Sequence, residues 1–434
     1  MERGLGGEVD TEGNPFTIMP NYPARTTHIL ARIDELAAIS EDDTGTTVTR
    51  TFGTPAFLKG RDLVQRWFEA AGLETRLDGI GNLRGRLASR RPGAKTFVLA
   101  SHIDTVVNAG KYDGPLGVLM GLDLVEHLIQ QQVDLPFHIE LMAFSDEEGV
   151  RFHTTYLGSK VVTGAFEPAL LQKTDANGIT LAQAIAEMGG NAASLATDAL
   201  PPAEWLGYFE LHIEQGPVLW ESKVPIALVT DIAGQQRVEL TWLGMAGHAG
   251  TVPMAMRQDA LAAAAEFVLA AEAFALRHGR GLVATVGQLR LVHAASNIIP
   301  GQVVHSLDLR SPDADQLAAA YADLQAQAST IATRRGVALE WQLVQATAPV
   351  QCDHELNRLL GRAIAASGYE VDGLVSGAGH DAVPASAVAP ATMAFIRCHK
   401  GISHNPLENV EADDVAAALE VAERFLLELK NAHE

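Results

Sequence analysis

The 434-residue sequence predicts an α/β fold whose chain is interrupted by a smaller α+β domain. Apolar strands alternate with helical patterns through residues 23–231 and again through 348–434, which is typical of a sheet covered on both faces. Between them, residues 232–347 follow the order strand, helix, strand, strand, helix, strand, the split pattern of a ferredoxin-like domain. We therefore predict a discontinuous first domain, an inserted second domain, and a loose N-terminal extension over residues 1–22.

Helical spacing and apolar runs locate the elements of the first part. Apolar residues at helical spacing predict helices over residues 27–39 and 58–71, and Gly72 can cap the second. Turn residues at 78–82 separate two short segments and predict a hairpin. The strands predicted here are 74–77, 83–87, 96–101, 137–144, 208–212 and 224–229, with a further helix at 117–131.

The inserted part and the C-terminal part are assigned in the same way. The inserted part has predicted strands at 237–242, 281–289, 303–309 and 337–344 and long helices at 257–277 and 314–334. The C-terminal part has a predicted helix at 357–367, a loop at 376–382, a strand at 393–396 and a helix at 413–430. The return of apolar strands after the insertion is the reason to treat the first domain as discontinuous.

The composition argues against several classes of protein. Apolar residues make up 47% of the chain and charged residues 20%, so the chain can bury a core. The net charge of −21 argues against nucleic acid and anionic membranes as partners, because no basic surface is available for phosphates. Two cysteines, Cys352 and Cys398, are too few for a disulfide framework. With no apolar run of about 18 residues and no signal-peptide pattern, we predict a cytoplasmic protein.

Polar side chains follow the apolar strands, where ligands collect in α/β sheets. His102 and Asp104 follow the strand at 96–101, and Glu147 and Glu148 follow the strand at 137–144. Each pair alone has a simpler explanation, a capping pair or a solvated acidic turn. Three imidazoles and two carboxylates together make one donor set: His102, Asp113, Glu148, His212 and His404. Such donors suit Zn²⁺ or Mn²⁺, and Glu147 would remain free as a proton acceptor.

At these residues the sequence resembles the M20 metallopeptidase family, and more closely its amidase branch of hydantoinase and carbamoylase type. The motifs that carry the resemblance are SHIDTVVNAGKYDGPLG (101–117), FSDEEGVRF (144–152), ELHIEQGPVL (210–219), GHAGTVPMAMRQDAL (247–261), ASNIIPGQVV (295–304) with DLR (308–310), SGAGHDA (376–382) and GISHNP (401–406). The resemblance implies a Zn-peptidase-like catalytic domain with a mixed central sheet. It also implies an inserted lid domain through which two chains form a homodimer.

The resemblance implies roles for individual residues. Two divalent ions per subunit, Mn²⁺ or Zn²⁺, would be held by Asp113 as the bridging ligand and by His102, Glu148, His212 and His404. Glu147 would be the general base, and Asp104 would orient its histidine. His248 would polarise the substrate carbonyl from across the dimer. The residues implied to bind the substrate are Gln215, Arg237, His248, Asn297, Arg310 and Gly379, with Asn297 and Arg310 on a carboxylate.

The implied reaction is hydrolysis of a ureido (N-carbamoyl) carbon–nitrogen bond in a small carboxylate. Allantoate is the substrate we expect, giving ureidoglycine, ammonia and carbon dioxide. Hydrolysis of N-carbamoyl-L-amino acids, N-carbamoyl-β-alanine or ureidoglycolate stays open, because relatives with these substrates share nearly all the catalytic residues. A true peptidase would lack the pair Asn297 and Arg310, and an inactive metal-binding protein would usually have lost a ligand or the base.

Overall fold

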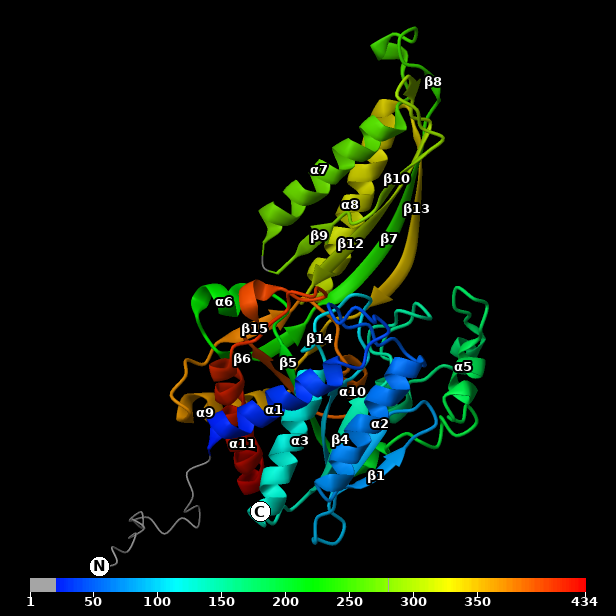
Figure 1. The fold of residues 1–434 in the computed structure, drawn as a ribbon. Coiled ribbons are helices and arrows are strands. Elements are labelled where there is room, and N and C mark those ends of the chain that lie inside the picture. The colour runs from blue at the N-terminus through cyan, green and yellow to red at the C-terminus, as the bar shows by residue number, and fades with distance from the viewer. Residues whose placement is uncertain (1–20, 280) are drawn as a thin grey trace, which may run out of the picture.

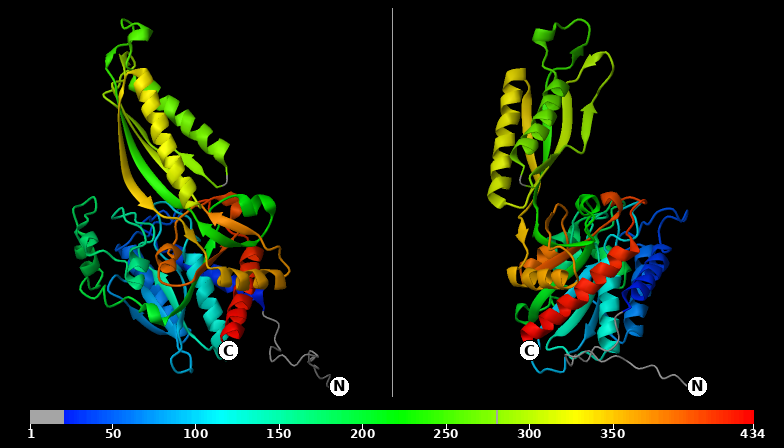
Figure 2. Two further views of the ribbon diagram at one scale, coloured as in Figure 1. Left: turned by 180° about the vertical axis from the view of Figure 1, so that it is seen from behind. Right: turned by 90° about the vertical axis from the view of Figure 1, so that its left-hand side faces the viewer.

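The computed structural model describes residues 21–279 and 281–434, which form two bodies of different shape (Figure 1). The larger body is built around a nine-stranded sheet, and an elongated body with a five-stranded sheet projects from it (Figures 1 and 2). The predicted extension at 1–22 lies outside the described residues except for its last two. Of these, Asn21 already caps helix α1 (Tyr22–Ala37).

The large sheet is mixed, as the sequence predicts. Its strand order is β1 (Glu74–Leu77), β2 (Leu83–Leu87), β4 (His138–Phe144), β3 (Thr96–His102), β5 (Trp205–Ile213), β16 (Ala391–Ile396), β6 (Ile226–Ile232) and β14 (Val350–Gln351), with β15 (Gly373–Ser376) also beside β6. The four central strands β4, β3, β5 and β16 are parallel, whereas β2 and β6 run antiparallel to their neighbours β4 and β16. The carboxyl ends of these four strands therefore meet along one edge.

Helices cover both faces of this sheet. One face packs against α1, α2 (Pro55–Ala70), α3 (Pro115–Gln130), α9 (His354–Ala366) and α11 (Ala412–His433), and the other against α10 (Ala382–Ser386), while α4 (Leu157–Thr163) contributes to both cores. On β3, Phe97 and Leu99 join the first core while Val98 and Ala100 join the second. A strand buried on both faces must be apolar throughout, which explains its continuous apolar run. Among the described residues, no helix combines the length and apolar character needed to cross a membrane.

The elongated body, which we call the lid, has its own sheet and core. Its elements are β7 (Gly234–Leu243), α7 (Ala260–His278), β9 (Val283–Thr285), β10 (Leu289–Val292), β12 (Gln302–Ser311), α8 (Ala314–Arg335) and β13 (Ala338–Thr347). The sheet order is β10–β12–β7–β13, with β9 also beside β12, the ferredoxin-like arrangement that the sequence predicts. Helices α7 and α8 pack on one face, around Trp242 and Phe267, and the other face is open. We propose residues 232–347 as one domain, because this sheet, both helices and their core lie within that range.

The structure differs from the predictions in several places. The single strand predicted at 281–289 is wrong, because the chain forms two short strands, β9 and β10, on either side of Gly287. There the hydroxyl of Ser306 accepts the N–H of Gln288, which interrupts the ladder. The region between β4 and β5 also holds helices α4 and α5 (Leu181–Glu187) that the sequence pattern did not predict. Helix α2 begins earlier than predicted, because Thr54 caps it and Pro55 fits its first turn.

Candidate metal centre

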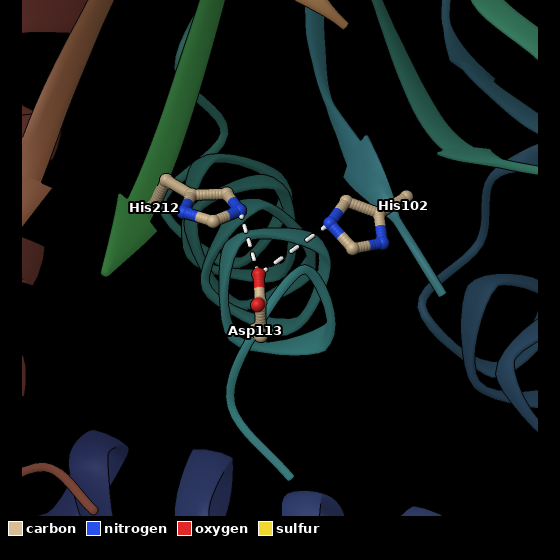
Figure 3. Close-up of side chains that lie close together, drawn as sticks. All are labelled: His102, Asp113 and His212. Atoms are coloured by element: carbon tan, nitrogen blue, oxygen red, sulfur yellow. Dashed lines mark ion pairs between the residues drawn. The ribbon is translucent and has the colours of Figure 1, made fainter. Parts of the chain in front are cut away.

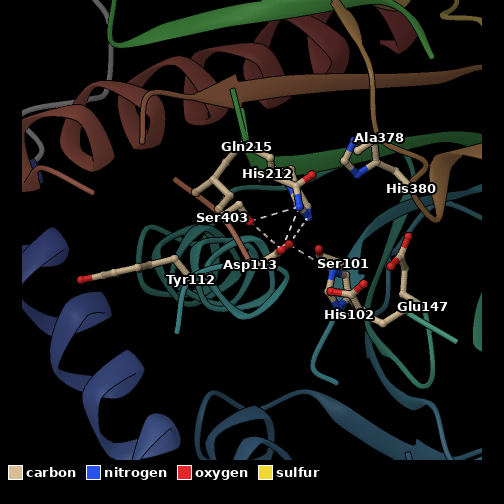
Figure 4. Close-up of polar contacts among 12 residues, drawn as sticks. Ser101, His102, Tyr112, Asp113, Glu147, His212, Gln215, Ala378, His380 and Ser403 are labelled. Atoms are coloured by element: carbon tan, nitrogen blue, oxygen red, sulfur yellow. Dashed lines mark hydrogen bonds and ion pairs between the residues drawn. The ribbon is translucent and has the colours of Figure 1, made fainter. Parts of the chain in front are cut away.

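Four parallel strands bring the predicted polar residues to one edge of the central sheet (Figure 4). Strand β3 ends at His102, and β4 ends shortly before Glu147. Strand β5 carries His212 near its end, and β16 leads into the loop of His404. Parallel strands share one direction, so residues that follow them are neighbours in space although they lie far apart in the chain.

Asp113, His102 and His212 form the first group of donors (Figure 3). The Nε2 atoms of His102 and His212 lie 3.7 Å and 3.1 Å from Oδ1 of Asp113. Their Nδ1 atoms lie 3.0 Å and 2.9 Å from the backbone carbonyl oxygens of Asp104 and Ile213. A carbonyl only accepts, so Nδ1 carries a proton, and Nε2 is the atom that faces the carboxylate and that can bind a metal ion once its own proton is lost. This is how imidazole ligands are oriented around a metal ion.

The other oxygen of Asp113 belongs to a second group with Glu148 and His404. Nε2 of His404 lies 3.1 Å from Oδ2 of Asp113 and 3.4 Å from Oε1 of Glu148. The same Oδ2 accepts hydrogen bonds from Nε2 of Gln215 at 2.8 Å and from the hydroxyl of Ser403 at 3.0 Å. The His404 side chain is 49% exposed, so this group opens to solvent. Asp113 thus offers one oxygen to each group.

The electrostatics of these donors fit a bound cation. Burial raises the pKa of Asp113, but its hydrogen bonds with the histidines outweigh burial and hold this pKa well below its ordinary value. The hydrogen bond to Asp113 is the main cause that raises the pKa of His404 to about 9. Burial lowers the pKa values of His102 and His212, and hydrogen bonds to carboxylates raise both above the ordinary value. Protons on these imidazoles balance the buried carboxylate, and a divalent ion among the same donors would do so instead.

Glu147 and Asp104 complete the acidic part of the site. Glu147 is buried, which raises its pKa well above the ordinary value; the charge of His102 opposes this shift and that of Glu148 adds to it. Asp104 accepts the N–H of Glu147 on Oδ1 at 3.1 Å and the N–H of Glu148 on Oδ2 at 3.2 Å. Its Oδ1 also lies 3.6 Å from Nδ1 of His102. Asp104 therefore holds the turn that carries both glutamates as well as facing the histidine.

Tyr156 lies at the site, against the loop that carries Gly379, and the sequence did not indicate it. A Cβ atom on Gly379 would lie 1.6 Å from the phenol oxygen of Tyr156, so only glycine fits there. Tyr156 has a left-handed φ of 63°, and its N–H donates to the carbonyl of Glu147 at 3.0 Å. The neighbouring His380 is buried, with its ring centroid 4.6 Å from that of His212. The only sequence signal for Tyr156 is its position shortly after the acidic turn.

Glu408 is a second residue that sequence reasoning missed. Its Oε1 accepts the N–H groups of Tyr112 at 2.7 Å and Asp113 at 3.1 Å, and its Oε2 lies 3.1 Å from the hydroxyl of Ser403. Burial, with the charge of Asp113, raises the pKa of Glu408 to about 7. Glu408 thus ties the loop of Asp113 to the loop of His404. It follows His404 by four residues, and that proximity is the signal that could have found it.

The predicted substrate-binding residues of the lid lie in two places. Arg237 and Arg310 lie at its base, where Nη1 of Arg310 donates to the carbonyl of Gly377 at 2.6 Å. His248 in β8 (Gly247–His248) and Asn297, next to β11 (Ile298–Ile299), are exposed. Strands β8 and β11 pair at the far tip of the lid, away from the edge that carries the donors (Figure 1). One chain therefore brings only the arginines toward the candidate metal centre.

Known proteins are similar in sequence to this chain over most of its length. The model of peptidase family M20/M25/M40 matches residues 98–428. An N-carbamoyl-L-amino acid amidohydrolase of Geobacillus stearothermophilus is 39% identical over 390 residues, which cover 90% of this chain and 95% of that protein. Allantoate deiminase 1 of Glycine max is 37% identical over 424 residues, covering 90% and 86%.

A solved structure shares the fold as well. The crystal structure of a hydantoinase/carbamoylase family amidase from Burkholderia multivorans matches this one with a TM-score of 0.87 and 32% sequence identity, covering 93% of this chain and 98% of that chain. The mixed sheet, its covering helices and the inserted ferredoxin-like body agree with this likeness. The chain therefore belongs to peptidase family M20/M25/M40, in its amidase branch, and is a hydrolase of carbon–nitrogen bonds.

Proposed function

We propose that this enzyme hydrolyses a ureido carbon–nitrogen bond of allantoate, consuming one water and giving ureidoglycine, ammonia and carbon dioxide. We propose two divalent ions in the site, because Asp113 offers its two oxygens to two separate donor groups. Paired ions that share a carboxylate are a recurrent arrangement in hydrolases. The soybean relative that carries the name allantoate deiminase supports the choice of substrate.

The metal ligands follow from the two groups. His102 and His212 would hold one ion, Glu148 and His404 the other, with Asp113 between them. Mn²⁺ and Zn²⁺ both accept nitrogen and oxygen donors of this kind. When bound, such ions supply Lewis acidity and lower the pKa of a water molecule.

Glu147 would move the proton. A buried carboxylate with a raised pKa suits a group that takes a proton from the attacking water and then delivers it to the leaving nitrogen. Arg310 would hold the substrate carboxylate, because a planar guanidinium offers two parallel N–H groups. Gln215, which is hydrogen-bonded to Asp113, would contact the substrate beside the ions, and Gly379, against which the phenol of Tyr156 packs, would line the pocket.

A second copy of the chain would supply His248 and Asn297. Both are exposed at the lid tip, where they cannot reach the donor groups of their own chain as it is folded here. The lid also exposes Leu269 and Leu276 on α7 and the outer edge of β10, an apolar surface that a second copy can cover. We therefore propose a homodimer formed through the lid, in which His248 polarises the ureido carbonyl in the partner.

A second candidate substrate is an N-carbamoyl-L-amino acid. The Geobacillus relative of that name supports it, at 39% identity. The same ligands, the same base and the same arginine would serve, since both substrates combine a ureido group with a carboxylate. The group that differs between them is the substituent next to the carboxylate.

An assay of ammonia release tests the proposal. The protein would be stripped with a chelator, reloaded with Mn²⁺ or Zn²⁺, and compared on allantoate, ureidoglycolate, N-carbamoyl-L-amino acids and N-carbamoyl-β-alanine. We expect the highest kcat/KM on allantoate and no activity before reloading. Glu147→Gln should retain metal and lose about a hundredfold or more in kcat, while Glu167→Gln at an exposed position should change nothing. Full activity without metal or with Glu147→Gln would refute the mechanism, and a higher kcat/KM on another substrate would replace allantoate.

A further inference from the structure

We infer that Asp308 is a positioning residue that fixes the guanidinium of Arg310 for the carboxylate of the substrate, an inference that rests on the ureido carboxylate proposed above. Asp308 lies on β12, on the open face of the lid sheet. A groove of about 1020 Å³ runs over this face and is lined by Asp308, Arg310, Arg237 and, from the larger body, Gly377. The groove therefore joins the base of the lid to the loop of Gly379.

Asp308 grips one edge of Arg310. Its Oδ1 accepts from Nε at 2.9 Å, and its Oδ2 accepts from Nη2 at 3.0 Å. Nη1 donates to the carbonyl of Gly377 at 2.6 Å. These contacts use three of the five N–H bonds of the guanidinium. The remaining two N–H bonds, one on Nη1 and one on Nη2, are left to bind a carboxylate.

The same carboxylate organises the neighbouring strand. Asp308 pairs directly with Arg237 across β12 and β7, and its Oδ2 accepts from Nε of Arg237 at 3.2 Å and from Nε2 of Gln235 at 2.7 Å. One aspartate thus holds two arginines and leaves the cluster with one net positive charge. Burial raises the pKa of Asp308, but hydrogen bonds and charge from Arg310 outweigh it and lower this pKa, so the carboxylate stays ionised at neutral pH.

The physical consequence is preorganisation. A long arginine side chain held at two of its nitrogens loses little rotamer freedom when the substrate binds, whereas a free one loses much more. Asparagine has nearly the same shape as aspartate, but its amide group presents N–H where Arg310 also presents N–H. Asp308→Asn should therefore release the guanidinium without emptying the space that the side chain fills.

The test compares two substrates and three variants of the metal-loaded enzyme. The substrates are an N-carbamoyl-L-amino acid and its carboxamide, which keeps the ureido group and lacks the carboxylate. Asp308→Asn should raise KM for the carboxylate by about three- to tenfold, with kcat nearly unchanged and no effect on the carboxamide. Asp308→Glu should recover part of the loss. Glu340→Gln removes an exposed negative charge from the neighbouring strand β13, outside the residues that line the groove, and should leave both substrates unaffected.

A double-variant cycle separates positioning from a structural role. In an Arg310→Ala background, Asp308→Asn should raise KM for the carboxylate much less than in the wild type, because only one of its two arginine contacts, that with Arg237, remains. Additive effects, an equal loss on the carboxamide, or an unchanged or lower KM would overturn the inference. Calorimetric binding of the N-carbamoyl amino acid is the second readout. Loss of that binding in Asp308→Asn supports the inference even if the wild type hydrolyses none of the ureido compounds, which would refute only the proposed function. No binding to the wild type would overturn the inference, whereas the proposed function is decided by the ammonia-release assay on allantoate.

Discussion

Replacing Asp104 by asparagine tests how the acidic turn is held. The carboxylate accepts two backbone N–H groups, a buried one from Glu147 at 3.1 Å and a half-buried one from Glu148 at 3.2 Å. Asparagine keeps one acceptor and turns the other into a donor that faces an N–H. One hydrogen bond to a charged acceptor is lost, about 1.5–3 kcal/mol, and the other becomes neutral at a cost of roughly 1 kcal/mol. The sum, about 2.5–4 kcal/mol, is the loss of stabilisation expected for the turn that positions the proposed base and one proposed ligand.

Two measurements should report this loss. If most of that energy is needed to place Glu147, kcat should fall by about a hundredfold or more, since 1.4 kcal/mol corresponds to tenfold. Metal affinity, measured by competition with a chelating dye, should fall by about tenfold to a hundredfold, as for other residues that orient ligands. The exposed Asp134→Asn is the matched control and should behave as wild type. An Asp104→Asn protein with unchanged kcat and unchanged metal affinity would refute the reasoning.

Further predictions concern the loop, the ions and the lid. Gly379→Ala should lower the free energy of unfolding in urea by about 1–3 kcal/mol and lower kcat/KM, because its Cβ would lie 1.6 Å from the phenol oxygen of Tyr156. Adding Tyr156→Phe should recover part of the loss. A Gly379→Ala protein as stable as the wild type would contradict the clash. Reloading the stripped protein should raise its Tm, because an ion at a hundred times its Kd stabilises the native state by about 2.7 kcal/mol; an unchanged Tm would argue against the site. His305 is buried in the lid and accepts from Nε1 of Trp242 at 2.9 Å, and burial lowers its pKa although the bond to the Ser306 carbonyl opposes the shift. Its contribution to stability is therefore present above the pKa of the unfolded state, about 6.5, and is lost as the pH falls through the lower pKa of the folded state. Amide exchange in β12, corrected for intrinsic rates, should therefore rise on acidification in the wild type and rise less in His305→Gln. An identical pH dependence of exchange in the two proteins would exclude this role.

Much of the fold could be predicted from the sequence because local patterns and topology agree. The continuous apolar run at 96–101 predicted a doubly covered strand, and β3 packs into two cores. The order of elements between residues 232 and 347 predicted the ferredoxin-like sheet. The break in the strand near Gly287 could not be predicted, because it depends on a hydrogen bond to a side chain of a strand that follows later in the chain.

The sequence by itself determined which donors are available and that they follow apolar strands, because the polarity of a residue after a strand is a local property. From this alone His102, Glu148 and His212 could be expected at one edge. Only the tertiary structure decided that Asp113 gives one oxygen to each donor group and that Glu408 holds its loop. It also decided that Asp308 holds Arg310, and that His248 lies at the lid tip, far from the donor groups of its own chain. These facts depend on contacts between distant segments, which no local pattern in the chain encodes.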